Sequence, residues 1–315
     1  TSLIPRRSKA RDMSMHKTLS AVFAFGLLAL TACARAEHPP RNADPAVWVV
    51  RDADTTIYLF GTVHILKPDV VWFDDEVKAA FDRSDELVTE MVAPSPAEMA
   101  GLVAQLAYNP DGPTVSEQLA PADRDRFLAA LKREGVAQEP LDHFDPWLAG
   151  IQLSVAPLDR LGYKADSGAE TVLERAAKAQ GKRISGLETP AQQLGYFDAM
   201  PKRLQIAFLN DTVSELPGLE KSFRTLLVSW SRGKTEAIGR EMNGSLEKTP
   251  ELAGILLYQR NERWAQWIAQ RMAQPGTVFV AVGAGHLAGK GSVQEDLAKR
   301  GFSARRISKR DFGLK

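Results

Sequence analysis

Two histidines close the same short pattern at distant points of the chain. Gly61-Thr-Val-His64 follows an apolar run over residues 57–60, and Gly283-Ala-Gly-His286 follows another over residues 277–282. One such pattern occurs often by chance and fits a turn with a satisfied polar residue. Two of them at matching strand ends indicate that a pair of imidazoles shares one site, because open α/β sheets place their sites at the carboxyl ends of their strands. The third histidine of the folded body, His143, is expected to lie at the surface or to pack.

Two glutamates occupy similar positions at predicted strand ends. Glu90 lies near the end of a predicted strand over residues 86–92, and Glu188 lies between a strand over 183–188 and a helix that Thr189 begins as N-cap. A buried carboxylate must be paired, hydrogen-bonded or bound to a metal. The alternative for either residue is a place on the solvated face of an edge strand. We interpret Glu90 as a metal ligand or general base and Glu188 as a second candidate base.

Two polar residues fall within the apolar face of a predicted helix. Apolar residues recur at helical spacing from Leu257 to Met272, and Arg260 and Asn261 lie inside that stripe. Polar groups on a buried face need partners. Arg260 is therefore expected to find a buried carboxylate or an anion, either as a plain salt bridge or as part of a site that holds substrate or orients a carboxylate.

A third glutamate has a local structural explanation. Ser167 and Glu170 fit a capping box at the start of a helix within residues 163–181. This pattern predicts that the Glu170 side chain turns back to the helix N-terminus.

The order of predicted elements indicates an α/β fold. Its central mixed sheet is built from two duplicated strand–Gly-x-x-His–helix–strand halves, and a large helical insertion or cap accompanies it. A strand over 47–50 forms a hairpin with the first histidine-bearing strand. The remaining predicted elements are a helix over 74–82, helical regions over 94–161 and 191–275, a helix over 292–300 and a last strand over 303–307.

The first residues have the features of a processing signal. Residues 1–36 combine an upstream extension, a short basic segment and an apolar stretch that ends in Leu30-Thr-Ala-Cys33. This tetrapeptide resembles the bacterial lipobox, which predicts a lipid anchor on Cys33, the one cysteine of the chain. The alternatives are ordinary secretion with cleavage after Ala34-Arg-Ala36, and a twin-arginine signal at Arg6-Arg7. The predicted location is the bacterial cell envelope, lipid-anchored or soluble in the periplasm.

The rest of the chain is expected to form one domain. Residues 37–46, rich in proline, are a predicted tether, and residues 47–315 are long enough for a single large domain that closes across both histidine motifs. The net charge is +1 from 40 basic and 39 acidic side chains, and no basic stripe stands out. Nothing in this composition indicates a nucleic-acid partner.

Several separated motifs together resemble the TraB/GumN family, which includes the TIKI proteins. The similarity covers most of residues 47–308. The motifs are Gly61–His64, the strand with Glu90, Gly186–Pro190 followed by Gln192-Gln193, Arg260-Asn261 and Val282–Gly291. The resemblance implies a metal-dependent hydrolase fold with a duplicated core. In the TIKI branch it implies a divalent-metal peptidase site, carried here by His64, His286 and Glu90. The chain has Gly168-Ala-Glu170 where relatives often show Gly-x-Asp.

The residues themselves suggest compatible chemistry. Two neutral imidazoles and a carboxylate make a three-ligand site that leaves positions open for water and substrate. Manganese, cobalt and zinc all suit this ligand set, and Glu188 or Glu90 could accept the proton of the attacking water. The sequence thus predicts an envelope metallohydrolase that acts on a peptide or protein. An esterase is one alternative, and a non-catalytic protein that sequesters a peptide or polysaccharide is another.

Overall fold

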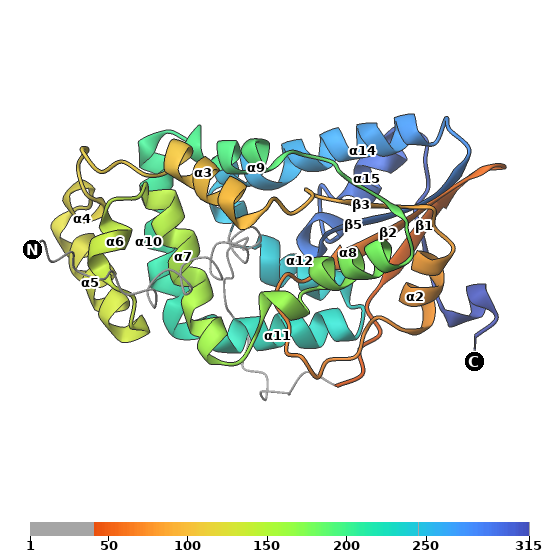
Figure 1. Cartoon of the computed structure of the whole chain (residues 1–315), viewed down its shortest axis with the longest axis horizontal. Helices are drawn as coiled ribbons and strands as arrows, with labels where there is room; N and C mark the ends of the chain where they lie inside the picture. The colour runs from red at the N-terminus through yellow and green to blue at the C-terminus, as the bar shows by residue number, and fades with distance from the viewer. Residues whose placement is uncertain (1–40, 245, 315) are drawn as a thin grey trace, which may run out of the picture.

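A six-stranded mixed sheet forms the centre of the computed structural model, which describes residues 41–244 and 246–314 (Figure 1). The strand order is β4-β3-β5-β2-β1-β6. Strands β4, β3, β5 and β2 are parallel, whereas β1 is antiparallel to both β2 and β6. The α/β class with a mixed central sheet is therefore confirmed. The strands are β1 (Val47–Arg51), β2 (Thr55–Thr62), β3 (Glu86–Thr89), β4 (Arg183–Gly186), β5 (Gly276–Gly283) and β6 (Arg305–Ile307).

Strand β5 lies between β2 and β3, although more than half of the chain separates it from either strand. Its register aligns Gly283 with Thr62 of β2 and Ala281 with Thr89 of β3. The three strands consequently end at one edge of the sheet. The second strand–Gly-x-x-His–helix–strand unit ends in β6, which pairs with β1 at the far side of the sheet.

The alternating side chains of the central strands fill two separate cores. Ile57 and Leu59 pack with Val278 and Val280 beneath α14 (Gln259–Arg271) and α15 (Val293–Lys299). Phe60 and its neighbours on the opposite face pack against α2 (Asp75–Asp82), α8 (Ala169–Ala179) and α11 (Leu219–Ser231). The sheet is thus covered on both faces, as buried parallel strands require.

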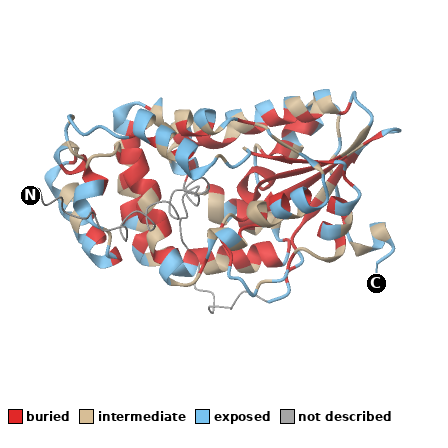
Figure 2. Cartoon of the chain, in the orientation of Figure 1, coloured by how far each residue is buried: buried red, intermediate tan, exposed pale blue. Residues whose placement is uncertain are grey.

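Most of the other helices form the predicted helical region, at the end of the elongated molecule away from the sheet (Figure 1). They are α3 (Pro96–Leu106), α4 (Val115–Gln118), α5 (Pro121–Glu134), α6 (Gln138–Asp142), α7 (Pro146–Arg160), α9 (Pro190–Asp198), α10 (Lys202–Glu215) and α13 (Pro250–Ala253). Helices α3, α7, α9, α10 and α13 share a third core, which includes Met99, Trp147 and Phe208, and Figure 2 shows the inner faces of α7 and α10 buried. Helix α12 (Thr235–Asn243) lies beside the sheet instead, where Asn243 donates to the carbonyl of Gly285 after β5.

The last residues of the predicted tether pack against the domain. Ala43 and Ala46 are buried, and the backbone N–H groups of Ala43 and Asp44 donate to the carbonyls of Val71 and Ser231. The predicted signal, including Cys33, and residues 37–40 of the tether lie outside the described residues. Within the described ranges, none of the helices combines the length and apolarity that a membrane crossing requires.

Candidate functional site

Four polar side chains follow the four parallel strands at a single edge of the sheet. His64 comes two residues after β2, Glu90 directly after β3, Glu188 two residues after β4, and His286 in the short 3-10 turn η5 (Ala284–Leu287) after β5. Glu90 and Glu188 are joined by their backbones, because the Glu188 N–H donates to the Glu90 carbonyl at 2.8 Å. Glu90, Glu188 and His286 are buried, and His64 is partly exposed.

The first glycine of each Gly-x-x-His pattern allows the two motifs to meet. A Cβ atom on Gly61 would lie 3.0 Å from the Ala284 Cα, so the two loops pack backbone to backbone at this point. A Cβ atom on Gly283 would lie 3.1 Å from Glu90 Oε1, 3.6 Å from His286 Cδ2 and 3.8 Å from His64 Nε2. The open side of Gly283 therefore faces the two histidines and Glu90 together, as the strand-end argument predicts.

Arg260 lies at the centre of the buried charges. Its Nη2 donates to Glu90 Oε2 at 2.6 Å and to Glu188 Oε2 at 2.8 Å, while its Nε donates to Glu188 Oε1 at 3.0 Å. The predicted pairing of Arg260 with a buried carboxylate is confirmed. Arg260 stands in the first turn of α14, directly after the π-helical turn η4 (Gly254–Tyr258), a distortion that often marks functional sites.

Both histidine rings have an oxygen atom close to Nδ1. His286 Nδ1 lies 2.5 Å from Asn261 Oδ1 in a hydrogen bond, and His64 Nδ1 lies 2.6 Å from Glu170 Oε1 as an ion-pair contact. An acceptor at Nδ1 favours the tautomer whose proton is on that atom and leaves Nε2 with a free lone pair. Asn261 is fully buried and also donates to the Gly291 carbonyl, so the predicted position of Asn261 within a buried face has this explanation.

The charges of the site follow from burial and from these partners. Burial lowers the pKa of His286 to about 3, so its ring is neutral at pH 7. Burial opposes ionisation of Glu90, but Arg260, followed by His286 and His64, lowers the Glu90 pKa to about 2. Burial also disfavours the charged form of His64, yet the nearby Glu170 and Glu90 carboxylates raise its pKa above the ordinary value. Glu90 is therefore an ionised, permanently negative group beside a neutral imidazole.

Glu170 was not predicted to belong to this site. The predicted capping box with Ser167 is wrong, because Gly168 is the N-cap of α8 and no side chain caps that helix. The first turn of α8 instead docks on the His64 loop, where the Ala169 N–H donates to the Val63 carbonyl at 3.0 Å. Tertiary contact thus replaces the local capping interaction, and Glu170 reaches the imidazole.

Three further side chains donate hydrogen bonds to the carboxylates of Glu90 and Glu188. Gln193 Nε2 donates to Glu90 and to Glu188 at 3.1 Å each, and both Tyr196 Oη and Trp264 Nε1 donate to Glu188 Oε1 at 3.1 Å. Glu188 therefore accepts five hydrogen bonds, two of them from Arg260. The sequence offered a signal for Gln193, which lies in the quoted Gln192-Gln193 motif, and for Trp264, which lies in the same apolar stripe as Arg260.

The donor set of the site fits a divalent cation. Two imidazoles with Nδ1 held by outer acceptors and a carboxylate beside them are the arrangement that metal-binding histidines use. Arg260 Nη1 lies 3.3 Å from His286 Nε2, so cation binding at that nitrogen requires this contact to give way. Among the described residues, the ligand atoms of His64, Glu90 and His286 do not all lie within 4.8 Å of one another, and closer approach would accompany binding.

The α8 contact makes a prediction about stability. A Cβ atom on Gly168 would lie 1.9 Å from the His64 backbone oxygen, so Gly168→Ala must move α8 or the histidine loop. We expect this variant to lose about 1–3 kcal/mol of unfolding free energy in urea denaturation, as overpacking typically costs. Gly195→Ala is the matched control, because that glycine lies inside α9 with open space around its Cβ position and alanine should stabilise the helix. Equal effects of the two variants would contradict the docking of α8 on the loop.

Comparisons with known proteins find relatives over most of the chain. The chain is 22% identical over 253 residues to the uncharacterized protein YbaP of Escherichia coli, covering 80% of this chain and 92% of YbaP. It is 24% identical over 327 residues to an uncharacterized protein of Treponema pallidum, covering 94% and 95% of the two chains. It is also 24% identical over 325 residues to a metalloprotease TIKI homolog of Amphimedon queenslandica, covering 86% of this chain and 63% of that protein. No solved structure matches. Residues 46–306 match the TraB/PrgY/gumN family, and the chain belongs to that family.

Proposed function

We propose that this protein is a metal-dependent hydrolase that cleaves peptides, with His64, His286 and Glu90 as the ligands of a divalent cation. The observation that carries the proposal is the convergence of the two rings and Glu90 on one glycine. The open side of Gly283 is close to His64 Nε2, to the His286 ring and to Glu90 Oε1, and each ring has an oxygen atom close to Nδ1. The similarity to a protein named a metalloprotease TIKI homolog supports the same chemistry.

Different residues of the site would carry out different steps of such a reaction. A bound divalent cation of this kind supplies an acidified water and a Lewis acid for the substrate carbonyl. Glu90 Oε1, which also accepts the Gly283 N–H at 2.7 Å, can ligate the cation, whereas its pKa of about 2 makes it a weak base for the proton of the attacking water. Arg260 Nη1 faces the same space and can stabilise negative charge that develops on the substrate oxygen.

Glu188 has a different part in this proposal from the one that its sequence position suggests. With five donors around its two oxygens, it is a poor acceptor for a further proton. We assign it the role of holding Arg260 in place. Asn261 and Glu170 are positioning residues, because each acts on the reaction through the ring that it orients.

The proposed cellular setting is the bacterial envelope, with a lipid anchor on Cys33 or a soluble periplasmic form. The proposal has its support in the lipobox-like tetrapeptide and in the apolar stretch before it. The substrate class is a peptide or protein of that compartment. Manganese, cobalt and zinc are the candidate cations, because imidazole and carboxylate ligands suit all three.

Metal removal tests the proposed activity. The full chain is stripped with a chelator, reloaded with manganese, cobalt or zinc, and assayed for metal content and for cleavage of a peptide library by mass spectrometry. We expect cleavage to disappear on stripping and to return with about one bound ion per chain. Cleavage that survives stripping would contradict a metal-dependent reaction. Peptide binding without cleavage in every metal state would favour the alternative of a sequestering protein, and cleavage of ester substrates alone would favour an esterase.

A further inference from the structure

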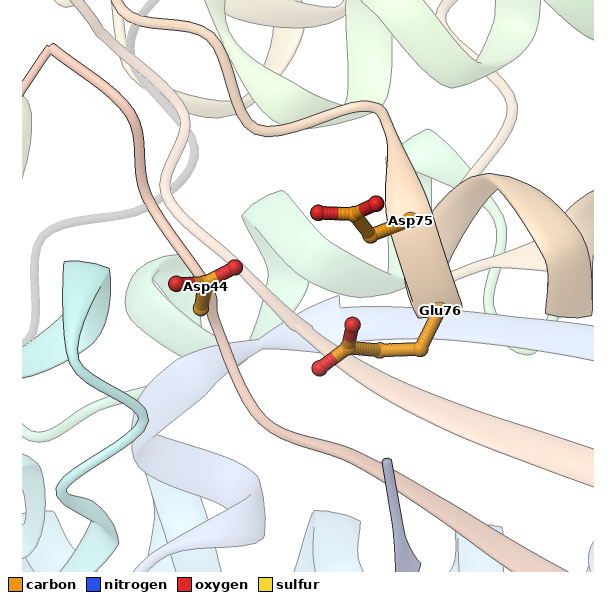
Figure 3. Close-up of side chains that lie close together, drawn as sticks. All are labelled: Asp44, Asp75 and Glu76. Atoms are coloured by element: carbon orange, nitrogen blue, oxygen red, sulfur yellow. The ribbon is translucent and has the colours of Figure 1, made fainter. Parts of the chain in front are cut away.

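Three carboxylates lie together at a second place in the fold. This place shares no residue with the site around His64, Glu90, Glu188, Arg260 and His286, which we call the strand-end site. Asp44, from the segment before β1, meets Asp75 and Glu76 from the first turn of α2 (Figure 3). One ligand oxygen from each lies within 4.8 Å of those from the other two. The elements are far apart in sequence, so the fold creates this cluster.

The positive charge beside the cluster balances only part of it. Lys309, in the 3-10 turn η6 (Lys309–Phe312), places its Nζ 2.5 Å from Asp75 Oδ2 and 3.3 Å from Asp44 Oδ1. Asp74 is the N-cap of α2 and adds a fourth acidic side chain next to the cluster in the chain. Within the described part of the chain, Lys309 is thus the one cation paired with these three convergent carboxylates.

Glu76 supplies an independent observation. The residue is 9% exposed, and its Oε2 is fully covered by protein yet has no hydrogen-bond partner among residues 41–244 and 246–314. A buried carboxylate oxygen without a partner is costly, so natural proteins normally pair such atoms with a donor, a water or an ion. The Glu76 carboxylate extends toward the same space as those of Asp44 and Asp75 (Figure 3). The same carboxylate therefore has an unpartnered oxygen and a place in the acidic cluster.

We propose that Asp44, Asp75 and Glu76 bind a hard divalent cation, Ca²⁺, that takes the place of the Lys309 ammonium. Three carboxylates with no nitrogen or sulfur ligand match the oxygen preference of this ion. Ca²⁺ also accepts irregular geometry and completes its shell with waters and carbonyls, whereas Mg²⁺ demands a near-ideal octahedron. The site joins the segment before β1 to α2, next to the C-terminal turn η6. Its occupation would fasten the segment before β1 to α2, while η6 would lose the ion pairs of Lys309.

Calcium binding to the full chain tests this inference. After chelator treatment, bound calcium is measured by equilibrium dialysis and thermal unfolding is followed with and without millimolar CaCl₂. We expect one calcium per chain and a higher midpoint of unfolding, because an ion that binds only the folded state stabilises it. Glu76→Gln and Asp44→Asn should each abolish this binding. Asp159→Asn is the matched control, since that carboxylate is 61% exposed and paired with Lys164 on the surface.

Lys309→Met separates a cation site from a plain ion-pair cluster. If Lys309 competes with calcium, its removal should tighten calcium binding by about tenfold, through loss of a competing charge at contact distance. Absence of calcium binding in the wild type and in Lys309→Met, or unchanged binding in Glu76→Gln and Asp44→Asn, would overturn the proposal. The result is independent of the hydrolase proposal, because calcium binding should persist in His64→Ala and imidazole sites favour other metals.

Discussion

Replacing either site histidine with alanine is expected to abolish peptide cleavage, with a fall in kcat/KM of about 10³-fold or more, since loss of an outer partner alone costs 10–100-fold. His64→Ala and His286→Ala each remove one of three proposed ligands, so bound metal should fall in parallel. His286→Ala should also destabilise the protein, because the ring is buried and packs 4.4 Å from the Trp264 ring centre. Steady-state kinetics, metal analysis and circular dichroism on the same preparations check these effects.

The matched control is His143→Ala, a histidine that lies outside the strand-end site in the helical region. It should keep both activity and metal. Asn261→Ala and Glu170→Gln should fall between the two extremes, with losses of about 10–100-fold, because they leave the ligand in place but release its orientation. Full activity and full metal content in both His64→Ala and His286→Ala would refute the proposed site.

Two physical rules made parts of the site predictable from the sequence. A parallel strand delivers whatever follows it to the carboxyl edge of the sheet, so two Gly-x-x-His motifs and two glutamates after strands could be placed together without knowing the strand order. Arg260 could be predicted because a guanidinium inside an apolar stripe has to meet an acid. The first argument depends on strand direction and the second on what burial requires of a polar group, and neither needs the details of packing.

The parts that could not be predicted depend on contacts between distant segments. Nothing in the local sequence shows that β5 inserts between β2 and β3, because strand order is decided by tertiary packing. The sequence around Glu170 matches a capping box, but α8 packs against the His64 loop, and Glu170 contacts His64 instead. For the same reason the partnerless oxygen of Glu76 became visible only when α2 and the segment before β1 were placed together.

Arg260→Met is expected to cost about 3–5 kcal/mol of unfolding free energy, the largest loss of stability that we predict for a single substitution. The change leaves Glu90 and Glu188 buried and close together without the cation that lies between them. Arg260→Lys should restore only part of the loss, since a single ammonium cannot reproduce the fork of three N–H groups that bridges both carboxylates. Urea denaturation of the three proteins measures these differences.

A double-mutant cycle identifies the source of the loss. If unpaired charge is the cause, the double variant Arg260→Met with Glu188→Gln should lose less unfolding free energy than the two single variants lose together. The second change removes a charge that the first leaves uncompensated.

Arg263→Met is the matched control on the same helix, an exposed arginine that contacts the Tyr196 ring and no buried acid of the site. Exposed arginines of this kind contribute little, so its effect should stay below about 1 kcal/mol. An Arg260→Met variant as stable as Arg263→Met would mean that Glu90 and Glu188 are neutralised by another group. A cation between Glu90 and the two histidines is the candidate for that group, and chelation of the variant would then unfold it.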